Sequence, residues 1–264
     1  MKNILLVDTS YTVFFRFNAT KRWFSFSEPE EYAEMKEDSW LNNEKFKNKY
    51  EEMFQKGLEK HIKNYKIDDI IWIQDDSRSN IWRTKIYPEY KTNRVDCVSK
   101  SDVVFCYTYN EFLPKFFKKN NLKNIKISGA EADDIIAVTT KYLSKKNINS
   151  VVVTSDTDFL QLLNKNTILV DLKLKELQYK LSPQEDLEIK IIRGDKSDNI
   201  PPIKSRIGEK TAIKYLQDEK LFNELLKESD VKKQYELNKL LIDFNNIPDK
   251  INKEIINKLD KMFL

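Results

Sequence analysis

Nine carboxylates stand at the ends of five short segments of this 264-residue chain, and four of these segments adjoin an apolar run. A buried core does not tolerate so much unpaired negative charge, and bound divalent metal is the simplest compensation. Ligands that offer only oxygen select hard ions such as Mg²⁺ or Mn²⁺. A carboxylate site for two such ions suggests phosphodiester hydrolysis. The nine are Asp8, Asp75, Glu131, Asp133, Asp134, Asp156, Asp158, Asp195 and Asp198.

The elements that must position these acids follow from the apolar runs, which predict five short buried strands. Strands that alternate with helices predict βαβ units and an α/β fold with a mostly parallel sheet. Ligands of such sheets bind beyond the carboxyl ends of the strands, where Asp8, Asp75 and Asp156 are all expected. The predicted strands are residues 3–7, 69–74, 124–127, 151–154 and 167–170, and the predicted helices between them are 44–65, 109–120 and 131–145.

The pattern changes after residue 181. Ser182 and Pro183 are the residue types preferred at a helix N-cap and at the first helical position, and only helices are predicted beyond them. We therefore expect a first domain at residues 1–181 and a helical region at 182–264. The acidic, polar stretch 25–48 is expected to be a loop or an insertion. The predicted breaks between the C-terminal helices are Pro201-Pro202, Gly208 and Pro248.

Each acidic motif also has an ordinary structural interpretation. The acids of Glu131-Ala132-Asp133-Asp134 suit a helix N-terminus, and Asp156 could be an N-cap before a helix. Taken alone, each single acid is better explained in this way. The recurrence of acids at several predicted strand ends favours the metal site instead.

Composition excludes several classes of protein. No stretch approaches the ~18 apolar residues of a membrane span, and the apolar run at the N-terminus is too short for a signal peptide. Cys97 and Cys106 give neither a disulfide framework nor a zinc pattern, so we expect a cytoplasmic protein with reduced cysteines. The single histidine, His61, lies in a lysine-rich run and is expected to be a solvated helix residue.

Basic residues gather in two places in the sequence and would flank the acidic centre, although the net charge is only +4. Such flanks suit a polyanionic substrate, whereas an ordinary solvated lysine surface explains many of the other lysines. Gly208 begins a helix, and a turn of this kind directs backbone N–H groups at a phosphate; a plain turn between helices is the alternative. The two basic groups are Arg78, Arg83, Lys85, Lys91 and Arg94, and then Lys204, Arg206, Lys210 and Lys214.

Taken in order, these motifs resemble the flap endonuclease/5′→3′ exonuclease family over most of the chain. The segments that carry the resemblance are the strands ending at Asp8 and Asp75, residues 87–94, the Glu131 and Asp156 motifs and residues 194–212. Within the family, residues 75–83 and 241–249 most resemble the T-even phage replicative ribonuclease H. The resemblance implies a PIN-like sheet and a site for two Mg²⁺ ions, which Mn²⁺ could replace.

The resemblance also implies roles for individual residues. Asp8, Asp75, Glu131 and either Asp133 or Asp134 would hold the first ion, and Asp156, Asp158, Asp195 and Asp198 would help to hold the second. Lys91 matches the basic residue of a helical arch (about residues 78–100), and Arg94 and Arg83 would assist it. Tyr87, Tyr90 and Trp82 could stack on bases or could pack the arch onto the body. The alignment leaves open whether Asp75 or Asp76 is the ligand.

The helical region resembles the helix–three-turn–helix motif with which this family holds duplex DNA by its backbone. The DNA-binding residues implied here are Lys204, Arg206, Gly208, Lys210 and Thr211. The chain departs from the family pattern before Gly208, where a second glycine is usual and residues 202–207 contain none. This departure puts the family's monovalent-cation site in doubt.

The function implied is that of a 5′ nuclease acting on flaps, nicks and RNA–DNA hybrids, which removes primers during DNA replication as a monomer. A replication clamp or a single-strand-binding protein could be a partner, and the end of the chain, residues 260–264, could dock on a clamp or simply be an apolar helix end. Two alternatives remain open, a PIN-type RNA endonuclease and a non-catalytic protein that binds DNA junctions. An aspartyl phosphatase is disfavoured because Ser10 stands where such enzymes need a second acid.

Overall fold

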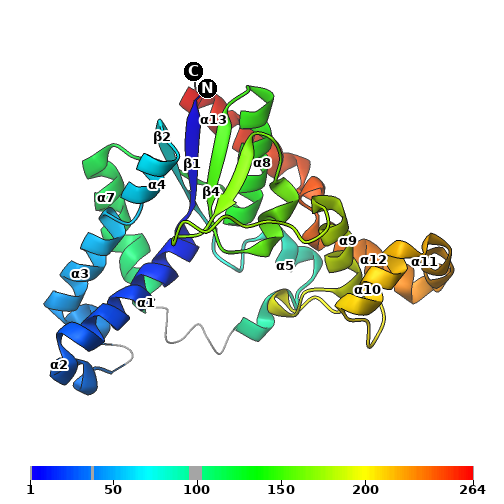
Figure 1. Cartoon of the computed structure of the whole chain (residues 1–264), viewed down its shortest axis with the longest axis horizontal. Helices are drawn as coiled ribbons and strands as arrows, with labels where there is room; N and C mark the ends of the chain where they lie inside the picture. The colour runs from blue at the N-terminus through cyan, green and yellow to red at the C-terminus, as the bar shows by residue number, and fades with distance from the viewer. Residues whose placement is uncertain (1, 37–38, 95–102, 264) are drawn as a thin grey trace.

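The computed structural model describes residues 2–36, 39–94 and 103–263 (Figure 1). Residues 95–100 of the predicted arch, with Cys97, lie outside these ranges. Five parallel strands form one sheet in the order β3-β2-β1-β4-β5, so the predicted α/β class and parallel sheet are confirmed. The strands are β1 (Asn3–Asp8), β2 (Asp69–Gln74), β3 (Lys123–Lys126), β4 (Asn149–Val153) and β5 (Thr167–Val170).

Alternation along the strands sends side chains to two separate apolar cores, because successive residues of a strand face opposite sides of the sheet. Ile4 and Leu6 of β1 pack with helix α8 (Ala132–Lys145) and with α13 (Asp249–Phe263). Leu5 and Val7 pack on the opposite face with three further helices. These helices are α1 (Thr9–Ser27), α3 (Glu44–Gln55) and α7 (Leu113–Asn120).

The stretch 25–48, predicted to be a loop or an insertion, is mostly helical among its described residues, so the predicted loop is wrong and the insertion stays a prediction. Helix α1 runs on to Ser27, and α2 (Pro29–Glu34) and a 3₁₀ turn, η1 (Trp40–Asn42), lead into α3. The reason is a small aromatic core, in which the Trp40 and Phe46 rings lie 5.0 Å apart and Phe24 is fully buried. Of the acidic residues that suggested a loop, Glu30 and Glu34 are exposed.

The predicted helix 44–65 is divided into α3 and α4 (Glu59–Asn64) around Gly57. His61 of α4 is 1% exposed, and its Nε2 atom lies 2.8 Å from the carbonyl oxygen of Asp171. His61 is therefore a buried packing residue, and the predicted solvated position is wrong. Burial lowers its pKa, which keeps the ring neutral.

The C-terminal region is helical, as predicted. Ser182 caps α9 (Pro183–Arg193) by accepting a hydrogen bond from Glu185 N at 3.2 Å. The next helices, α10 (Glu209–Gln217), α11 (Glu219–Leu225) and α12 (Ser229–Ile242), extend away from the sheet (Figure 1). Helix α13 returns to the sheet, where Lys2 Nζ lies 5.6 Å from the centre of the Phe263 ring. The boundary at residue 181 stays a prediction, since α13 shares the core of the first domain.

Short elements connect the sheet to these helices at the edge where the strands end. The π-helical turn η3 (Thr108–Phe112) precedes α7, and the 3₁₀ turn η4 (Thr157–Leu162) follows β4. The remaining short elements are α5 (Trp82–Ile86), η2 (Thr92–Arg94), η5 (Lys196–Asp198) and η6 (Phe244–Asn246).

Candidate active site

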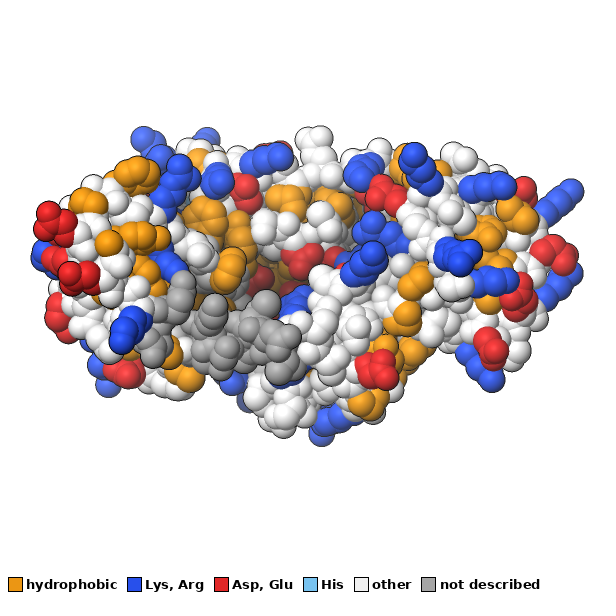
Figure 2. All heavy atoms as spheres, turned by 90° about the horizontal axis from the view of Figure 1, so that it is seen from below, with side chains coloured by type: hydrophobic (Ala, Val, Ile, Leu, Met, Phe, Trp, Pro, Cys, Tyr) orange, Lys and Arg blue, Asp and Glu red, His pale blue; other side chains and the backbone are white. Residues whose placement is uncertain are grey.

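Five aspartates line an open cavity of about 290 Å³ at the carboxyl ends of the strands. Asp198 is described below, and we call the other four the inner carboxylate group: Asp8, Asp75, Asp133 and Asp156. Figure 2 shows acidic side chains inside a hollow near the middle of one face, with lysine and arginine side chains beside it. The ligand position expected for a parallel sheet is therefore the position at which these acids meet.

The ends of β1, β2 and β4 and the start of α8 position this group. Asp8 ends β1 and caps α1 by accepting a hydrogen bond from Tyr11 N at 3.0 Å. Asp75 follows β2 and accepts hydrogen bonds from Ala132 N at 2.7 Å and Ser10 Oγ at 2.6 Å. Asp156 follows β4 and accepts one from Asp158 N at 2.9 Å. Each carboxylate therefore has a fixed orientation and keeps oxygen lone pairs for a ligand.

The inner carboxylate group is short of positive charge. Among the residues that the structure describes, no lysine or arginine forms an ion pair with any of its four members. Burial, followed by repulsion from Asp75 and Asp156, raises the pKa of Asp8 to about 7. Burial also raises the pKa of Asp133 well above its usual value, with Asp156 and Asp8 adding to the effect, although Lys91 opposes it. A divalent cation would relieve this repulsion.

The ambiguity between Asp75 and Asp76 is resolved in terms of position. Asp76 Oδ2 accepts a hydrogen bond from Gly129 N at 2.8 Å, and its Oδ1 lies 3.7 Å from Lys126 Nζ. These contacts hold Asp76 outside the cavity, whereas Asp75 lines it.

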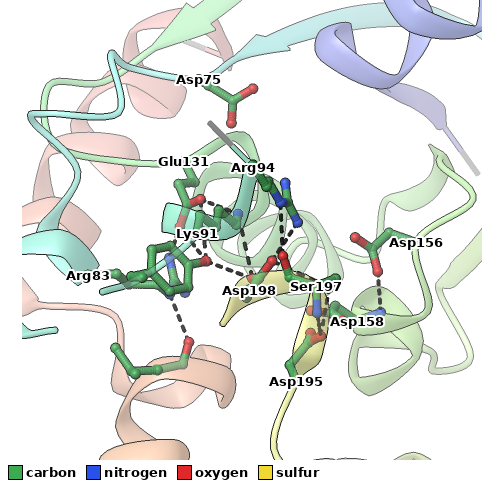
Figure 3. A network of polar contacts seen from close by, with 12 residues as sticks. Asp75, Arg83, Lys91, Arg94, Glu131, Asp156, Asp158, Asp195, Ser197 and Asp198 are labelled. Carbon is green, nitrogen blue, oxygen red and sulfur yellow. Dashed lines mark hydrogen bonds and ion pairs between the residues drawn. The ribbon is translucent and has the colours of Figure 1, made fainter. Parts of the chain in front are cut away.

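A second set of acids adjoins the first, and we call it the outer carboxylate group: Asp158, Asp195 and Asp198. One carboxylate oxygen from each lies within 4.8 Å of those of the others. Lys190 forms ion pairs with Asp158 and, at 2.8 Å, with Asp195. Although burial opposes it, Lys190 lowers the pKa of Asp195 to about 2. Unlike the inner group, this group already has cationic partners (Figure 3).

Gly194 shapes the loop that carries two of the outer acids. Its φ is +70°, and a Cβ atom there would lie 2.4 Å from the carbonyl oxygens of Ile200 and Pro201. Only glycine fits such a position. The loop then closes through Asp195 N to Ile200 O at 2.9 Å and Ile200 N to Asp195 O at 2.8 Å, which presents Asp195 and Asp198 on one side.

Two of the predicted metal ligands, Glu131 and Asp134, lie instead in a buried ion-pair network with Arg83 and Lys91. Arg83 lies 2.8 Å from each of the two carboxylates, and Lys91 Nζ lies 2.5 Å from Glu131 (Figure 3). Asp134 is fully buried and also accepts a hydrogen bond from Trp82 Nε1 at 2.9 Å. Burial opposes ionisation, but Lys91 and Arg83 lower the pKa of Glu131 to about 2.

This network holds two predicted site residues, Asp134 and Arg83, away from the cavity of the inner carboxylate group. Asp134 is removed from the cavity, so Asp133 is the member of the pair that faces it. Arg83 is 2% exposed and also donates to the carbonyl oxygen of Leu241 at 2.8 Å. Arg83 does not line the cavity of the inner carboxylate group, and its predicted role as an assisting residue stays a prediction. Asp156 lies with the inner group although it was assigned to the second ion.

Lys91 and Arg94 bring positive charge to the cavity, which both of them line. Lys91 has a φ of +55°, and its backbone N donates to Asp198 O at 2.9 Å. Burial acts to lower the pKa of Lys91, but Glu131, Tyr90 and Asp198 raise it well above its usual value. Arg94 lies 2.5 Å from Asp198 and is half-exposed. Both cations are therefore held at the site.

The predicted aromatic stacking residues are mostly buried. Tyr90 is 3% exposed, and its hydroxyl donates to Asp198 at 2.9 Å and to Glu131 at 3.1 Å. Trp82 is buried against α8, and the hydroxyl of Tyr87 donates to the carbonyl oxygen of Asn199 at 3.1 Å. These contacts pack residues 82–94 onto the body, which is the alternative that the sequence left open. Tyr90 is not available to stack on a base.

The predicted DNA-binding residues of the helical region gather at the turn before α10, and none of them lines the cavity. Arg206 has a φ of +66° and is exposed, Gly208 precedes α10, and Lys210 and Thr211 belong to its first turn. Lys204 pairs with Glu228 at 2.8 Å. A Cβ atom on Gly208 would meet nothing within 4 Å, so the packing of the chain itself does not require glycine there.

Several residues at the cavity were not predicted as site residues. Ser10 lines the cavity, and its Oγ lies 2.8 Å from the hydroxyl of Tyr109 in the π-helical turn η3. Such turns are frequent at functional sites. Phe14 lines the cavity and is 59% exposed. Prediction of helix α1 could have identified Ser10 and Phe14, because the spacing of residues along that helix places both side chains on the face that meets the acids.

Comparison with known proteins agrees with this geometry. A family model described as "5'-3' exonuclease, N-terminal resolvase-like domain" matches residues 3–191. A 5′-3′ exonuclease of Mycoplasmopsis pulmonis is 31% identical over 257 residues, covering 82% of this chain and 84% of that protein. One of Buchnera aphidicola subsp. Schizaphis graminum is 36% identical over 160 residues and 57% of this chain, and the matched part spans only 53% of that relative.

A solved structure shows the same fold. The flap endonuclease of bacteriophage T5, in a pseudo-enzyme–product complex with DNA and metal ions, has a TM-score of 0.72 and 17% identity, covering 98% of each chain. No helix among the residues described here is long and apolar enough to cross a membrane.

Proposed function

The chain belongs to the 5′-3′ exonuclease family, and we propose that it is a divalent-metal-dependent 5′ nuclease that cleaves DNA flaps, nicked duplexes and RNA–DNA hybrids. The observation that carries the proposal is the inner carboxylate group, which is fixed at the strand ends and has no ion-pair partner among the described residues. Repulsion of this kind costs stability unless a cation is bound. The related 5′-3′ exonucleases and the metal ions in the T5 complex support the same conclusion.

The donor set fits Mg²⁺ or Mn²⁺. All the candidate ligands are carboxylate oxygens, which these hard ions prefer. The inner and outer carboxylate groups adjoin each other, and Asp133 and Asp198 each line a second, small cavity that also holds Asp158 and Asp195. This arrangement suits two ions. When bound, they would supply an activated water and stabilise the leaving oxygen.

The residues of the chain itself bind and orient the substrate. Lys91 and Arg94 place two positive charges beside the carboxylates, where a phosphate diester can bridge them and the metal site. Their ion pairs with Glu131 and Asp198 hold both side chains in position before substrate arrives. Phe14 offers an exposed ring at the edge of the cavity for an unpaired base.

The helical region would hold the duplex. Arg206, Gly208, Lys210 and Thr211 form an exposed turn that leads into α10, and free backbone N–H groups at a helix start suit a phosphate. We propose that this turn belongs to a helix–three-turn–helix motif within the helical region, residues 182–264. Lys204 would join it after release from Glu228.

The wider setting is also proposed. Primer removal in the cytoplasm by a monomer, with a clamp or single-strand-binding protein as partner, is consistent with membership of this family. The particular resemblance to the T-even phage ribonuclease H stays a prediction.

The test is cleavage of a 5′-labelled flap duplex with Mg²⁺ or with EDTA, comparing the wild type with Asp156→Asn. We expect short labelled products that require metal and are lost in the variant. Asp75→Asn and Asp76→Asn form a matched pair, and only the first should abolish cleavage, because Asp76 lies outside the cavity. Tight binding with no cleavage in Mg²⁺ or Mn²⁺ would favour a junction-binding protein, and activity on structured RNA alone would favour an RNA endonuclease.

A further inference from the structure

Lys190 stands where a cation of the outer carboxylate group would be held. It is on α9, and its Nζ atom contacts the carboxylate of Asp158 and lies 2.8 Å from Asp195 Oδ2. The side chain is 13% exposed, so the ammonium group is largely withdrawn from water. The same two carboxylates, with Asp198, form the group whose oxygens lie within 4.8 Å of one another.

The ammonium group of Lys190 and a divalent ion cannot occupy the outer carboxylate group together. A divalent ion needs oxygen ligands at about 2.0–2.6 Å, and an ammonium group that bonds to the same carboxylates would lie next to it. Like charges at that separation repel strongly, because little water lies between them to screen the repulsion. Binding of a metal by Asp158 and Asp195 therefore requires Lys190 to withdraw.

The structure provides space for this withdrawal. Lys190 also lines a separate cavity of about 360 Å³ between η4, residues 178–183 and helices α9 and α10. Leu160, Leu187 and Ile213 line this cavity, together with the acids Asp186 and Glu209 and the cations Lys180 and Arg193. Glu209 is already paired with Lys180 and Arg193. The apolar wall suits the four-carbon stem of lysine, and Asp186, which has no ion pair among the described residues, suits its ammonium group.

We propose that Lys190 is an internal counter-ion of the outer carboxylate group that competes with the second divalent ion and sets the affinity of that site. The inference rests on the proposed function, because it takes the carboxylates as metal ligands. The inner carboxylate group has no such competitor and fills first. Lys190 stabilises the outer group before the second ion binds, and this ion must displace it, so the outer group is the weaker of the two sites.

The test is a Mn²⁺ titration of the free protein without substrate, followed by electron paramagnetic resonance and by calorimetry. The wild type should bind ions in a tight and a weak class. Lys190→Met, which keeps the length and loses the charge, should tighten the weak class by about tenfold or more and leave the tight class unchanged. Its metal-free melting temperature should fall, and added Mn²⁺ should raise it by more than in the wild type.

Two control variants make the result specific. Lys190→Arg keeps the positive charge and should keep the weak class weak. Lys180→Met removes a lysine that lines the same cavity but pairs with Glu209, and it should change neither class. Lys190→Gln gives a second neutral variant if circular dichroism shows that Lys190→Met is unfolded.

The possible outcomes separate the two proposals. If the weak class is unchanged or weaker in both neutral variants, Lys190 supports the site, and the inference is overturned while the proposed function stands. If the wild type binds no Mn²⁺ at all, the proposed function fails and the inference fails with it.

Discussion

Asp133 and Asp134 are consecutive residues at the start of α8, yet their carboxyl groups lie in opposite electrostatic surroundings. Asp134 faces the buried ion-pair network, where Arg83 lies 2.8 Å away and Trp82 donates a hydrogen bond. Asp133 belongs to the inner carboxylate group, where burial and the charges of Asp156 and Asp8 raise its pKa against the opposing effect of Lys91. One carboxylate is stabilised by the folded chain and the other is destabilised by it.

The contrast distinguishes acids that hold the fold together from acids that await a ligand. A buried carboxylate with an ion-pair partner contributes to stability chiefly because removal of one partner leaves the other charge unpaired. A buried carboxylate next to other carboxylates costs stability, and it is retained because of what it binds. Adjacent positions should therefore respond in opposite ways to the same substitution.

Asp133→Asn should give the largest effect on activity. It removes a proposed metal ligand from the inner group, and we expect the rate of flap cleavage in Mg²⁺ to fall by about 10³-fold. Removal of one like charge should at the same time leave the metal-free protein as stable as the wild type or more so. Single-turnover cleavage and thermal melting in EDTA measure the two quantities. A variant that is active at the wild-type rate would show that Asp133 is not a ligand.

Asp134→Asn should chiefly affect stability. The change leaves Arg83 with one carboxylate partner instead of two in a site closed to water. We expect the free energy of unfolding to fall by about 3 kcal/mol, as measured by urea denaturation. The variant that remains folded should still cleave within about tenfold of the wild-type rate, because Asp134 does not line the cavity. A large loss of activity with unchanged stability would contradict the distinction between the two residues.

The comparison also shows what the sequence could and could not predict. All five strands were predictable because apolar runs in a parallel sheet are buried on both faces, and strand ends located Asp8, Asp75 and Asp156 correctly. The direction of each acid within Glu131–Asp134 was not predictable, since it depends on where Arg83 lies in three dimensions. Helix α1 was missed because its buried positions are mixed threonines and aromatics. Because α1 was not predicted, Ser10 and Phe14, which lie on it, were not predicted as site residues either.

The inner carboxylate group should make the stability of the metal-free protein depend on pH. The folded pKa of Asp8 is about 7 against an ordinary value of 3.8, so between these values the folded state holds a proton that the unfolded state has lost. Its stabilising effect is thus fully present below about 3.8 and is lost as the pH rises to about 7. Asp133 acts in the same direction. We expect a loss of about 2 kcal/mol between pH 5 and pH 8 in EDTA, and recovery on addition of Mg²⁺.

The ion-paired acids provide the contrast within the same experiment. Glu131 and Asp195 have pKa values of about 2, so they are ionised in both states throughout this range and add no slope. Asp8→Asn should flatten the profile measured by urea denaturation at each pH. Equal stability of the wild type at pH 5 and pH 8 in EDTA would show that the inner group is not electrostatically strained.

The smallest expected effect concerns the aromatic residues of α1, which extend the comparison from charge to stacking. Phe14 and Phe26 are both exposed, by 59% and 78%, but only Phe14 lines the cavity beside Asp8. Loss of a base-stacking ring costs about 1–3 kcal/mol, so Phe14→Ala should weaken binding of a flap substrate in Ca²⁺ by about tenfold. Phe26→Ala should leave the dissociation constant unchanged, and neither variant should lose stability, because neither ring is buried. If the two substitutions weaken binding equally, the substrate contacts the length of α1 rather than the rim of the cavity. In that case, the position of an aromatic residue beside the inner carboxylate group would not be what makes it functional.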